Sequence, residues 1–285
     1  MNFGYIGLGE MGGAMCRQLV AAGEQVSVFD VSEHAVQALV DAGAQRAGSI
    51  AELARACDVI SICVPADDHV RAVMSGPDGV EGGAHGGLTV LVHSTIHPDT
   101  MRAVHAQAAA WGVSVHDACV TGGEAAAKEG ALAVFVSDLD ALCDRARHAL
   151  SIFGERIIDT GPPGSGAAVK IGVNVMTFAQ QAAAAAAFDL VEAQGASTDA
   201  LLDAWRHNRQ LAPMIERFTA MFAFPPEALA GMQDYLSNVV AIEQKDLALA
   251  LALGEGTRRG PSPVVAAIRD HLPVIFGLQG SEAHD

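Results

Sequence analysis

Lys170 and Asn174 are the residues of this 285-residue chain whose types and spacing best suit chemistry. They close the stretch GSGAAVKIGVN at 164–174, and because they are four residues apart, a helix places both on one face. A lone lysine in a largely buried helix tends to lose its proton near neutral pH. The pair therefore predicts a general base or acid beside an amide. The alternative is that Lys170 reaches the surface and Asn174 only caps a turn. The apolar neighbours that indicate burial are Val169, Ile171, Val173, Val175 and Met176.

A glycine-rich loop near the start of the chain has the spacing that accommodates a dinucleotide. It follows a short apolar strand predicted at 2–6 and precedes an amphipathic helix, which is the context that the GxGxxG pattern requires. Gly7 permits a tight turn, Gly9 lets the backbone approach a pyrophosphate, and Gly12 lets helix and strand pack closely. An ordinary strand-to-helix turn is the alternative. The cofactor-binding residues predicted here are Gly7, Leu8, Gly9, Glu10, Met11 and Gly12.

Asp30 is the acid expected to bind the adenosine ribose. It ends a predicted strand at 25–29 and lies 18 residues past Gly12, close to the spacing of such acids. Its carboxylate would accept from the ribose 2′-hydroxyl and repel a 2′-phosphate, and Val31 follows instead of an arginine. The sequence therefore favours NAD over NADP. The alternative is that Asp30 caps the helix that begins near Ser32.

Three further loops follow predicted strands, at the carboxyl edge where ligands bind in parallel sheets. Val64 and Pro65 follow the strand 58–64, and Thr95 lies in HSTIHP after the strand 88–92. The strand 113–118 leads into Thr121, Gly122 and Gly123, where a hydroxyl and two unobstructed amides would suit a carboxylate. A metal site at His93 and His97 is not expected, because Pro98 keeps them off a common helix face.

Alternating helices and short apolar strands indicate an α/β fold, a Rossmann-type doubly wound parallel sheet over 1–161. Beyond this region no strand is expected, so 162–285 is predicted to be an all-helical domain for substrate binding and oligomerisation. A long helix starting near 165 joins the two. The predicted helices of the second domain are 165–195, 198–208, 213–222, 226–253 and 262–271, with a break at Pro225-Pro226 and a frayed tail.

Composition excludes several classes of partner. The 33 acidic and 17 basic residues give a net charge of −16, which disfavours nucleic acids and anionic membranes. No apolar run extends over the roughly 20 residues that cross a bilayer, and no basic leader precedes an apolar segment, so we expect a cytoplasmic protein. Five cysteines without a CxxC pair indicate reduced core thiols rather than disulfides or zinc.

Six motifs in one order, over nearly the whole chain, resemble the β-hydroxyacid dehydrogenase family. Its best-known members are the 3-hydroxyisobutyrate dehydrogenases, with the tartronate semialdehyde reductases as close relatives. The motifs are GYIGLGEMGGAM, CVP at 63–65, HSTIHP at 93–98, DACVTGGEAAAKEGAL at 117–132, GSGAAVKIGVN at 164–174 and QKDLALA at 244–250.

The resemblance implies roles for individual residues. Lys170 matches the catalytic lysine and Asn174 the asparagine that holds the reacting oxygen, whereas Thr95 matches a hydroxyl near the nicotinamide. Lys245 matches a lysine of the helical domain that reaches the substrate and cofactor. The segment that binds the substrate carboxylate matches Thr121, Gly122 and Gly123. The implied activity is reversible NAD-dependent oxidation of a small 3-hydroxy acid to a semialdehyde or keto acid, by a homodimer or homotetramer joined through the helical domain.

Four positions depart from the family pattern. Thr121 replaces a serine and Asn238 an aromatic residue, and both changes affect which acid would bind; Gln18 and Val92 replace an asparagine and an aspartate. Three alternatives remain open. They are an aldehyde-acid reductase such as a tartronate semialdehyde reductase, an imine reductase on the same scaffold, and a non-enzymatic nucleotide sensor.

Overall fold

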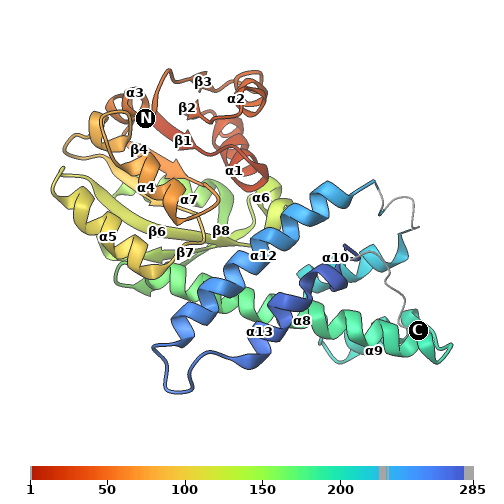
Figure 1. Ribbon diagram of the computed structural model, residues 1–285. Helices are drawn as coiled ribbons and strands as arrows, with labels where there is room; N and C mark the ends of the chain where they lie inside the picture. The colour runs from red at the N-terminus through yellow and green to blue at the C-terminus, as the bar shows by residue number, and fades with distance from the viewer. Residues whose placement is uncertain (1, 225–228, 230, 279–285) are drawn as a thin grey trace. The chain divides into compact units, whose positions relative to one another are not determined.

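The chain forms two compact units, residues 1–170 and 171–285 (Figure 1). The computed structural model describes residues 2–224, 229 and 231–278. The division falls inside the long helix α8 (Ser165–Ala193), directly after Lys170. The boundary predicted after residue 161 coincides with the end of the last strand at Gly161, shortly before α8 begins. Lys170 therefore belongs to the first unit and Asn174 to the second, on one continuous helix.

The first unit contains an eight-stranded sheet with the order β3-β2-β1-β4-β5-β6-β7-β8. Chain order reverses on either side of β1, so the predicted doubly wound Rossmann-type fold is confirmed. The apolar runs of β4 and β5 are buried throughout, as expected for central parallel strands. The strands are β1 (Asn2–Ile6), β2 (Gln25–Phe29), β3 (Gln45–Arg46), β4 (Val59–Ile62), β5 (Thr89–Val92), β6 (Ser114–Thr121), β7 (Leu132–Ser137) and β8 (Gly154–Gly161).

One pair of neighbouring strands departs from the parallel arrangement of the predicted doubly wound sheet. β7 runs antiparallel to β6, whereas the pairs from β3 through β6 and the β7–β8 pair are parallel. Only ten residues separate Thr121 from Leu132, and most of them form the short helix α6 (Gly123–Glu129). A crossover to a parallel neighbour needs a dozen or more residues, so this connection reverses the chain direction.

Helices pack on the sheet and form one core with it. α1, α6 and α7 contact one another, and α4 contacts α5. The predicted helix 138–150 divides into a short 3-10 turn at 139–141 and a later helix, α7. The remaining helices of this unit are α1 (Glu10–Ala21), α2 (Glu33–Val40), α3 (Ile50–Ala56), α4 (Asp67–Met74), α5 (Pro98–Ala109) and α7 (Asp144–Phe153).

The described part of the second unit consists of helices and the loops between them, without a strand, as predicted. Ser197 and Ser262 cap α9 and α13 with their hydroxyls, which explains why both helices begin where they do. The predicted break at Pro225-Pro226, the predicted start at 226 and the tail lie outside the described residues. The helices are α8, α9 (Thr198–His207), α10 (Pro213–Ala220), α12 (Gln233–Gly254) and α13 (Pro263–Ile275).

The expectation that α8 is largely buried holds on one face only. Ile171 is buried, but Val169 and Met176 are 40% and 60% exposed.

The cysteine prediction also needs one correction, because Cys143 is exposed, although all five thiols are free. Among the residues that the structure describes, no helix has both the length and the apolar character to span a bilayer.

Candidate active site

Four of the predicted site segments of the first unit follow neighbouring parallel strands. Gly7 follows β1, Val64 follows β4, Thr95 follows β5, and Thr121 ends β6. Since β1, β4, β5 and β6 are adjacent and parallel, their carboxyl ends share one edge of the sheet. The sheet order therefore brings these four segments to the edge where dinucleotides bind in such folds.

The glycine-rich loop fits a pyrophosphate. Gly7 has φ +88°, and a Cβ there would lie 2.2 Å from the carbonyl oxygen of Cys63. A Cβ on Gly12 would lie 2.1 Å from the carbonyl oxygen of Gly7, so helix α1 and the loop approach too closely for a side chain. Gly9 faces open space, and no side chain caps α1 at Gly9. The amides of the first turn of α1 are thus suitably placed for phosphate oxygens.

Asp30 holds the glycine-rich loop in place. Its Oδ2 accepts a hydrogen bond from the amide of Leu8 at 2.6 Å, and its Oδ1 accepts from the amide of Ser32 at 2.7 Å. The alternative role as a helix cap belongs to Ser32, whose hydroxyl accepts from the amide of Ala35. The carboxylate stays half-buried beside the loop, next to Val31, which is 96% exposed.

Side chains from the strand ends tie the neighbouring loops together. The amide of Val64 donates to Oγ of Ser94 at 2.8 Å, which joins the loops after β4 and β5. Thr95, beside Ser94, is half-buried. On α4, Asp67 accepts from the amide of His97 at 2.9 Å and so fixes the start of α5. These contacts restrict the loop that carries Thr95.

His93 is a structural residue between three strands. Its ring nitrogens lie 2.7 Å from the carbonyl oxygen of Ala118 and 3.0 Å from Oγ of Ser61. Burial lowers the pKa of His93 to about 4, although its hydrogen bond to Ala118 raises it. The imidazole is therefore neutral at pH 7, with both nitrogens occupied inside the sheet.

Thr121, Gly122 and Gly123 form the turn between β6 and α6. Gly122 has φ +131° and Gly123 φ +75°, conformations that favour glycine. A Cβ on Gly122 would lie 2.8 Å from that of Ala126. No side chain caps α6, so its first amides and the hydroxyl of half-buried Thr121 can serve an anionic group.

The start of α8 is bonded to the middle of β6. Oδ2 of Asp117 accepts from the amide of Gly164 at 2.7 Å, and Oδ1 accepts from the amide of Ala167 at 3.0 Å. Lys170, three residues further along α8, is half-buried. The same strand thus binds the helix that carries Lys170 and ends in the Thr121 turn.

In the second unit, Asn174 contacts Asp246 of α12. Its Nδ2 donates to Oδ2 of Asp246 at 2.6 Å, and both residues are buried. The other oxygen of Asp246 receives no hydrogen bond from the described residues, yet it lies 2.8 Å from Nζ of Lys245, so we treat this contact as an ion pair. One hydrogen on the Asn174 amide nitrogen is used by Asp246, and a second remains.

Sequence reasoning missed three residues that fix the predicted ones. Asp117 and Asp246 both stand inside motifs that the sequence singles out, DACVTGG and QKDLALA, but no spacing rule revealed which helices they contact. Ser94 directly precedes Thr95 in HSTIHP. The signal for Ser94 was its hydroxyl at the end of a strand, but polar loops commonly contain such hydroxyls, so the signal was not specific.

Comparisons with known proteins decide the family. Residues 2–161 match the model of the NAD binding domain of 6-phosphogluconate dehydrogenase. A 3-hydroxyisobutyrate dehydrogenase of Pseudomonas aeruginosa is 31% identical, over 94% of this chain and 90% of the relative. The chain belongs to the β-hydroxyacid dehydrogenase family. It is an oxidoreductase with an NAD(P)-binding domain, and it acts on hydroxyacid CH–OH groups.

Two further relatives of this β-hydroxyacid dehydrogenase differ in their ligands. An NAD-dependent L-serine dehydrogenase of Pseudomonas aeruginosa is 34% identical, over 86% of this chain and 83% of the relative. A solved structure of Psf3 in complex with NADP+ and 2-OPP is 25% identical, with a TM-score of 0.81 over 99% of this chain and 96% of the other. The similarity in fold therefore extends over both units, whereas the two relatives differ in the nucleotide that their names give.

Proposed function

We propose that this enzyme reversibly oxidises a small 3-hydroxy carboxylic acid to the semialdehyde or keto acid. One observation carries the proposal. Lys170 and Asn174 lie one turn apart on α8, and the first turn of α8 is bonded to β6, the strand that ends in Thr121, Gly122 and Gly123. A proton-accepting amine and a carboxylate-binding turn thus belong to two directly connected elements.

Each of these residues has a role in the proposed reaction. Lys170, as the neutral amine, takes the proton of the substrate hydroxyl, and Asn174 donates its remaining hydrogen to the oxygen as negative charge develops. The hydroxyl of Thr121 and the amides after it hold the carboxylate. Lys245 adds positive charge near the substrate and cofactor, and its ion pair with Asp246 fixes its position. A bound nicotinamide nucleotide supplies the hydride acceptor.

Two relatives and the substitution at Thr121 support a small acid as the substrate. Relatives named for 3-hydroxyisobutyrate and L-serine both act on small 3-hydroxy acids. Thr121 adds a methyl group where the family pattern has serine, which favours a substrate that is no bulkier beside its carboxylate. Asn238 is exposed on α12, where the pattern has an aromatic side chain. The reverse reaction makes this enzyme an aldehyde-acid reductase under reducing conditions.

We propose NAD as the preferred nucleotide. Asp30 keeps its carboxylate beside the glycine-rich loop through its bonds to Leu8 and Ser32, and a 2′-phosphate there would meet like charge. Glu33 adds a second acid, although Arg46 pairs with it at 2.5 Å. The solved relative with NADP+ shows that the family also takes the other nucleotide, so the preference depends on these side chains.

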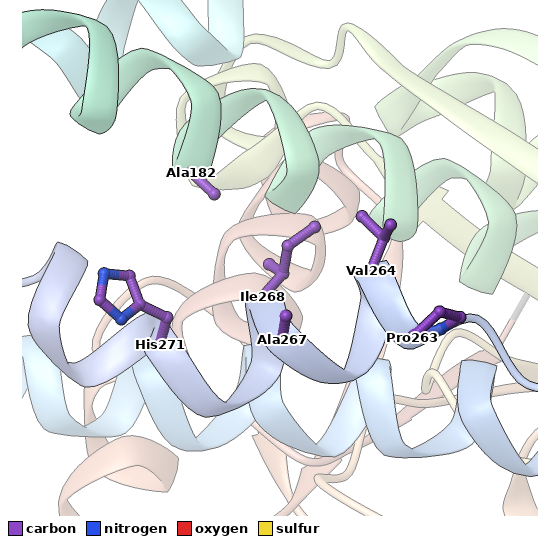
Figure 2. A pocket seen from close by; sticks show the side chains of 6 residues that line it. All are labelled: Ala182, Pro263, Val264, Ala267, Ile268 and His271. Carbon is purple, nitrogen blue, oxygen red and sulfur yellow. The ribbon is translucent and has the colours of Figure 1, made fainter.

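We also propose that the helical unit joins copies of the enzyme into a homodimer or homotetramer. Several large apolar side chains of this unit are exposed. α13 and α8 also border a groove of about 460 Å³, into which Val264 and Ile268 point, with Ala182 on the opposite side (Figure 2). None of the predicted site residues lines this groove. The exposed large apolar residues of this unit are Met176, Leu190, Phe224, Tyr235, Ile242, Val264 and Val274.

A substrate panel tests the proposed function. Turnover with NAD and NADP would be measured for 3-hydroxyisobutyrate, glycerate, serine, threonate and longer 3-hydroxy acids, with cyclic imines in the reducing direction. We expect the highest kcat/KM for a small 3-hydroxy acid with NAD. Turnover of cyclic imines without turnover of any hydroxy acid would contradict the proposal.

A further inference from the structure

Asp117 is a fully buried carboxyl group without a charged side chain among its hydrogen-bond partners. Its exposure is 0%, and the partners of its two oxygens are the backbone amides of Gly164 and Ala167. Burying such a group costs free energy unless its oxygens are hydrogen-bonded. These two amides belong to the start of α8, where a helix has unpaired N–H groups and a positive dipole end.

The contact between Asp117 and α8 is also close. A Cβ on Gly166 would lie 2.6 Å from the Cβ of Asp117 and 2.8 Å from the carbonyl oxygen of Phe135. A Cβ on Gly164 would lie 2.8 Å from the carbonyl oxygen of Pro98. The glycines of the GSG motif thus let the first turn of α8 lie directly on β6 and β7, with little room to shift.

Asp117 connects the strand that ends in the Thr121 turn with the helix that carries Lys170. It lies four residues before Thr121 on β6, so both side chains are on the same strand face, about 13 Å apart along the strand. Ala167 lies three residues before Lys170 on α8, a rise of about 4.5 Å. The path from the carboxylate-binding turn to the amine therefore runs through one strand segment, one carboxyl group and one helical turn.

We propose that Asp117 is the positioning residue that sets Lys170 relative to the Thr121 turn, through its two hydrogen bonds to the start of α8. This inference rests on the proposed role of Lys170. Asp117 touches no reacting atom. Its loss lets the first turn of α8 shift, and a displacement of about 1 Å at a reacting group lowers turnover by as much as about 100-fold.

The test compares Asp117→Asn and Asp117→Ala with Ser137→Ala. Ser137 is a matched control, because its Oγ accepts a hydrogen bond from the backbone amide of Asp117 at 2.9 Å, which joins β7 to β6. We expect kcat to fall about tenfold in Asp117→Asn and about 100-fold in Asp117→Ala, with nucleotide Kd and substrate KM within about threefold of wild type. Ser137→Ala should keep wild-type kcat.

Two further readouts separate positioning from a general loss of structure. In Asp117→Asn, which keeps the side-chain size, the amides of Gly164 and Ala167 should exchange with solvent faster than those of α1. In the Lys170→Ala background, Asp117→Ala should lower the residual turnover by less than about twofold, since the two residues act as one unit.

The outcomes distinguish this inference from the proposed function. Unchanged kcat in Asp117→Asn, or a full additive loss in the double variant, overturns the role of Asp117 alone. Wild-type turnover of Lys170→Ala overturns the proposed role of Lys170, and the inference fails with it. Loss of nucleotide binding in Asp117→Asn also overturns the inference, because the carboxyl group would then support the whole unit.

Discussion

Glu243 is an acid buried in the helical unit, next to the residues that hold Asn174. Its exposed fraction is 6%, and it faces the amide of Gln181, whose nitrogen lies 3.2 Å from Oε2 once the amide is oriented to donate. The pKa of Glu243 is raised to about 8, mainly because the carboxyl group is buried; the hydrogen bond from Gln181 opposes this shift, and the charge of Asp246 adds to it. The residue is therefore protonated over much of the physiological range.

The raised pKa makes the helical unit sensitive to pH. Because the pKa of Glu243 is higher in the folded state than in the unfolded state, its protonation stabilises the fold. This stabilisation is fully present below about pH 4.5 and is lost as the pH rises through about 8. Relative to Glu243→Gln, the wild-type free energy of unfolding should fall by on the order of 1 kcal/mol per pH unit in this window. Urea unfolding at pH 5 to 8 measures the difference. Glu255→Gln, at an exposed position, is the control, and parallel curves for wild type and Glu243→Gln would refute the assignment.

Asp30 determines nucleotide choice in this account. Asp30→Ala removes the carboxylate near the expected 2′-phosphate, and it also removes the hydrogen bond to the amide of Leu8. We therefore expect a weaker affinity for NAD and a ratio of kcat/KM for NAD over NADP that falls about tenfold or more. Steady-state assays with both nucleotides measure this ratio. Glu155→Ala, at an exposed position of β8, serves as the control for general negative charge, and an unchanged ratio in Asp30→Ala would assign the residue to loop structure only.

At the scale of the element, α8 contains two glycines in different environments. Gly166 lies against Asp117 and the carbonyl of Phe135, whereas Gly172 has nothing within 4 Å of its ideal Cβ. Both lie in the same helix, so replacing glycine by alanine changes the helix propensity by about the same amount at each position. Only their surroundings differ.

Replacing each glycine by alanine in a separate variant therefore separates the effect of packing from that of helix propensity. Gly166→Ala should destabilise the protein by about 1–3 kcal/mol and lower kcat, because the helix start must move away from β6. Gly172→Ala should stabilise it by about 0.5–1 kcal/mol through helix propensity. Thermal unfolding and kcat measure both effects. Equal effects of the two substitutions would show that α8 does not pack tightly on the sheet.

Strand positions were predictable from sequence, but the direction of β7 was not. The strands at 2–6 and 25–29 match β1 and β2, because each is a short apolar run between turn residues. The reversal at β7 followed from the short connection between Thr121 and Leu132, which the apolar pattern alone does not reveal. Connection length was thus the signal that could have corrected the prediction.

At the scale of the whole molecule, the motifs predicted which residues form the site better than they predicted the contacts that hold those residues in place. The glycine-rich loop, Asp30 and the Thr121 turn follow β1, β2 and β6, where the sheet order aligns strand ends. By contrast, the bonds from Asp117 to α8 and from Asp246 to Asn174 join residues 47 to 72 positions apart. Such contacts depend on tertiary packing, and a single sequence contains no local pattern for them.

Self-association is the prediction that belongs to the whole molecule. If the exposed apolar face of the helical unit joins copies, the wild-type enzyme should have the mass of a dimer or tetramer in solution. Val264→Asp places a charge on a side chain that is 63% exposed beside the groove, and should shift the mass toward the monomer. Light scattering after gel filtration measures the mass. Ala109→Asp, at an exposed position of α5, should leave the mass unchanged, and a monomeric wild type would contradict the prediction.

The central claim is that Lys170 exchanges the proton of the substrate hydroxyl. The most direct measurement compares kcat for the preferred hydroxy acid in wild type, Lys170→Ala and the control Lys128→Ala, whose lysine is exposed on α6 and pairs with Glu124. Nucleotide Kd is measured in parallel. We predict that Lys170→Ala loses at least about 100-fold in kcat while nucleotide binding and Lys128→Ala stay near wild type. Wild-type turnover by Lys170→Ala would contradict the account.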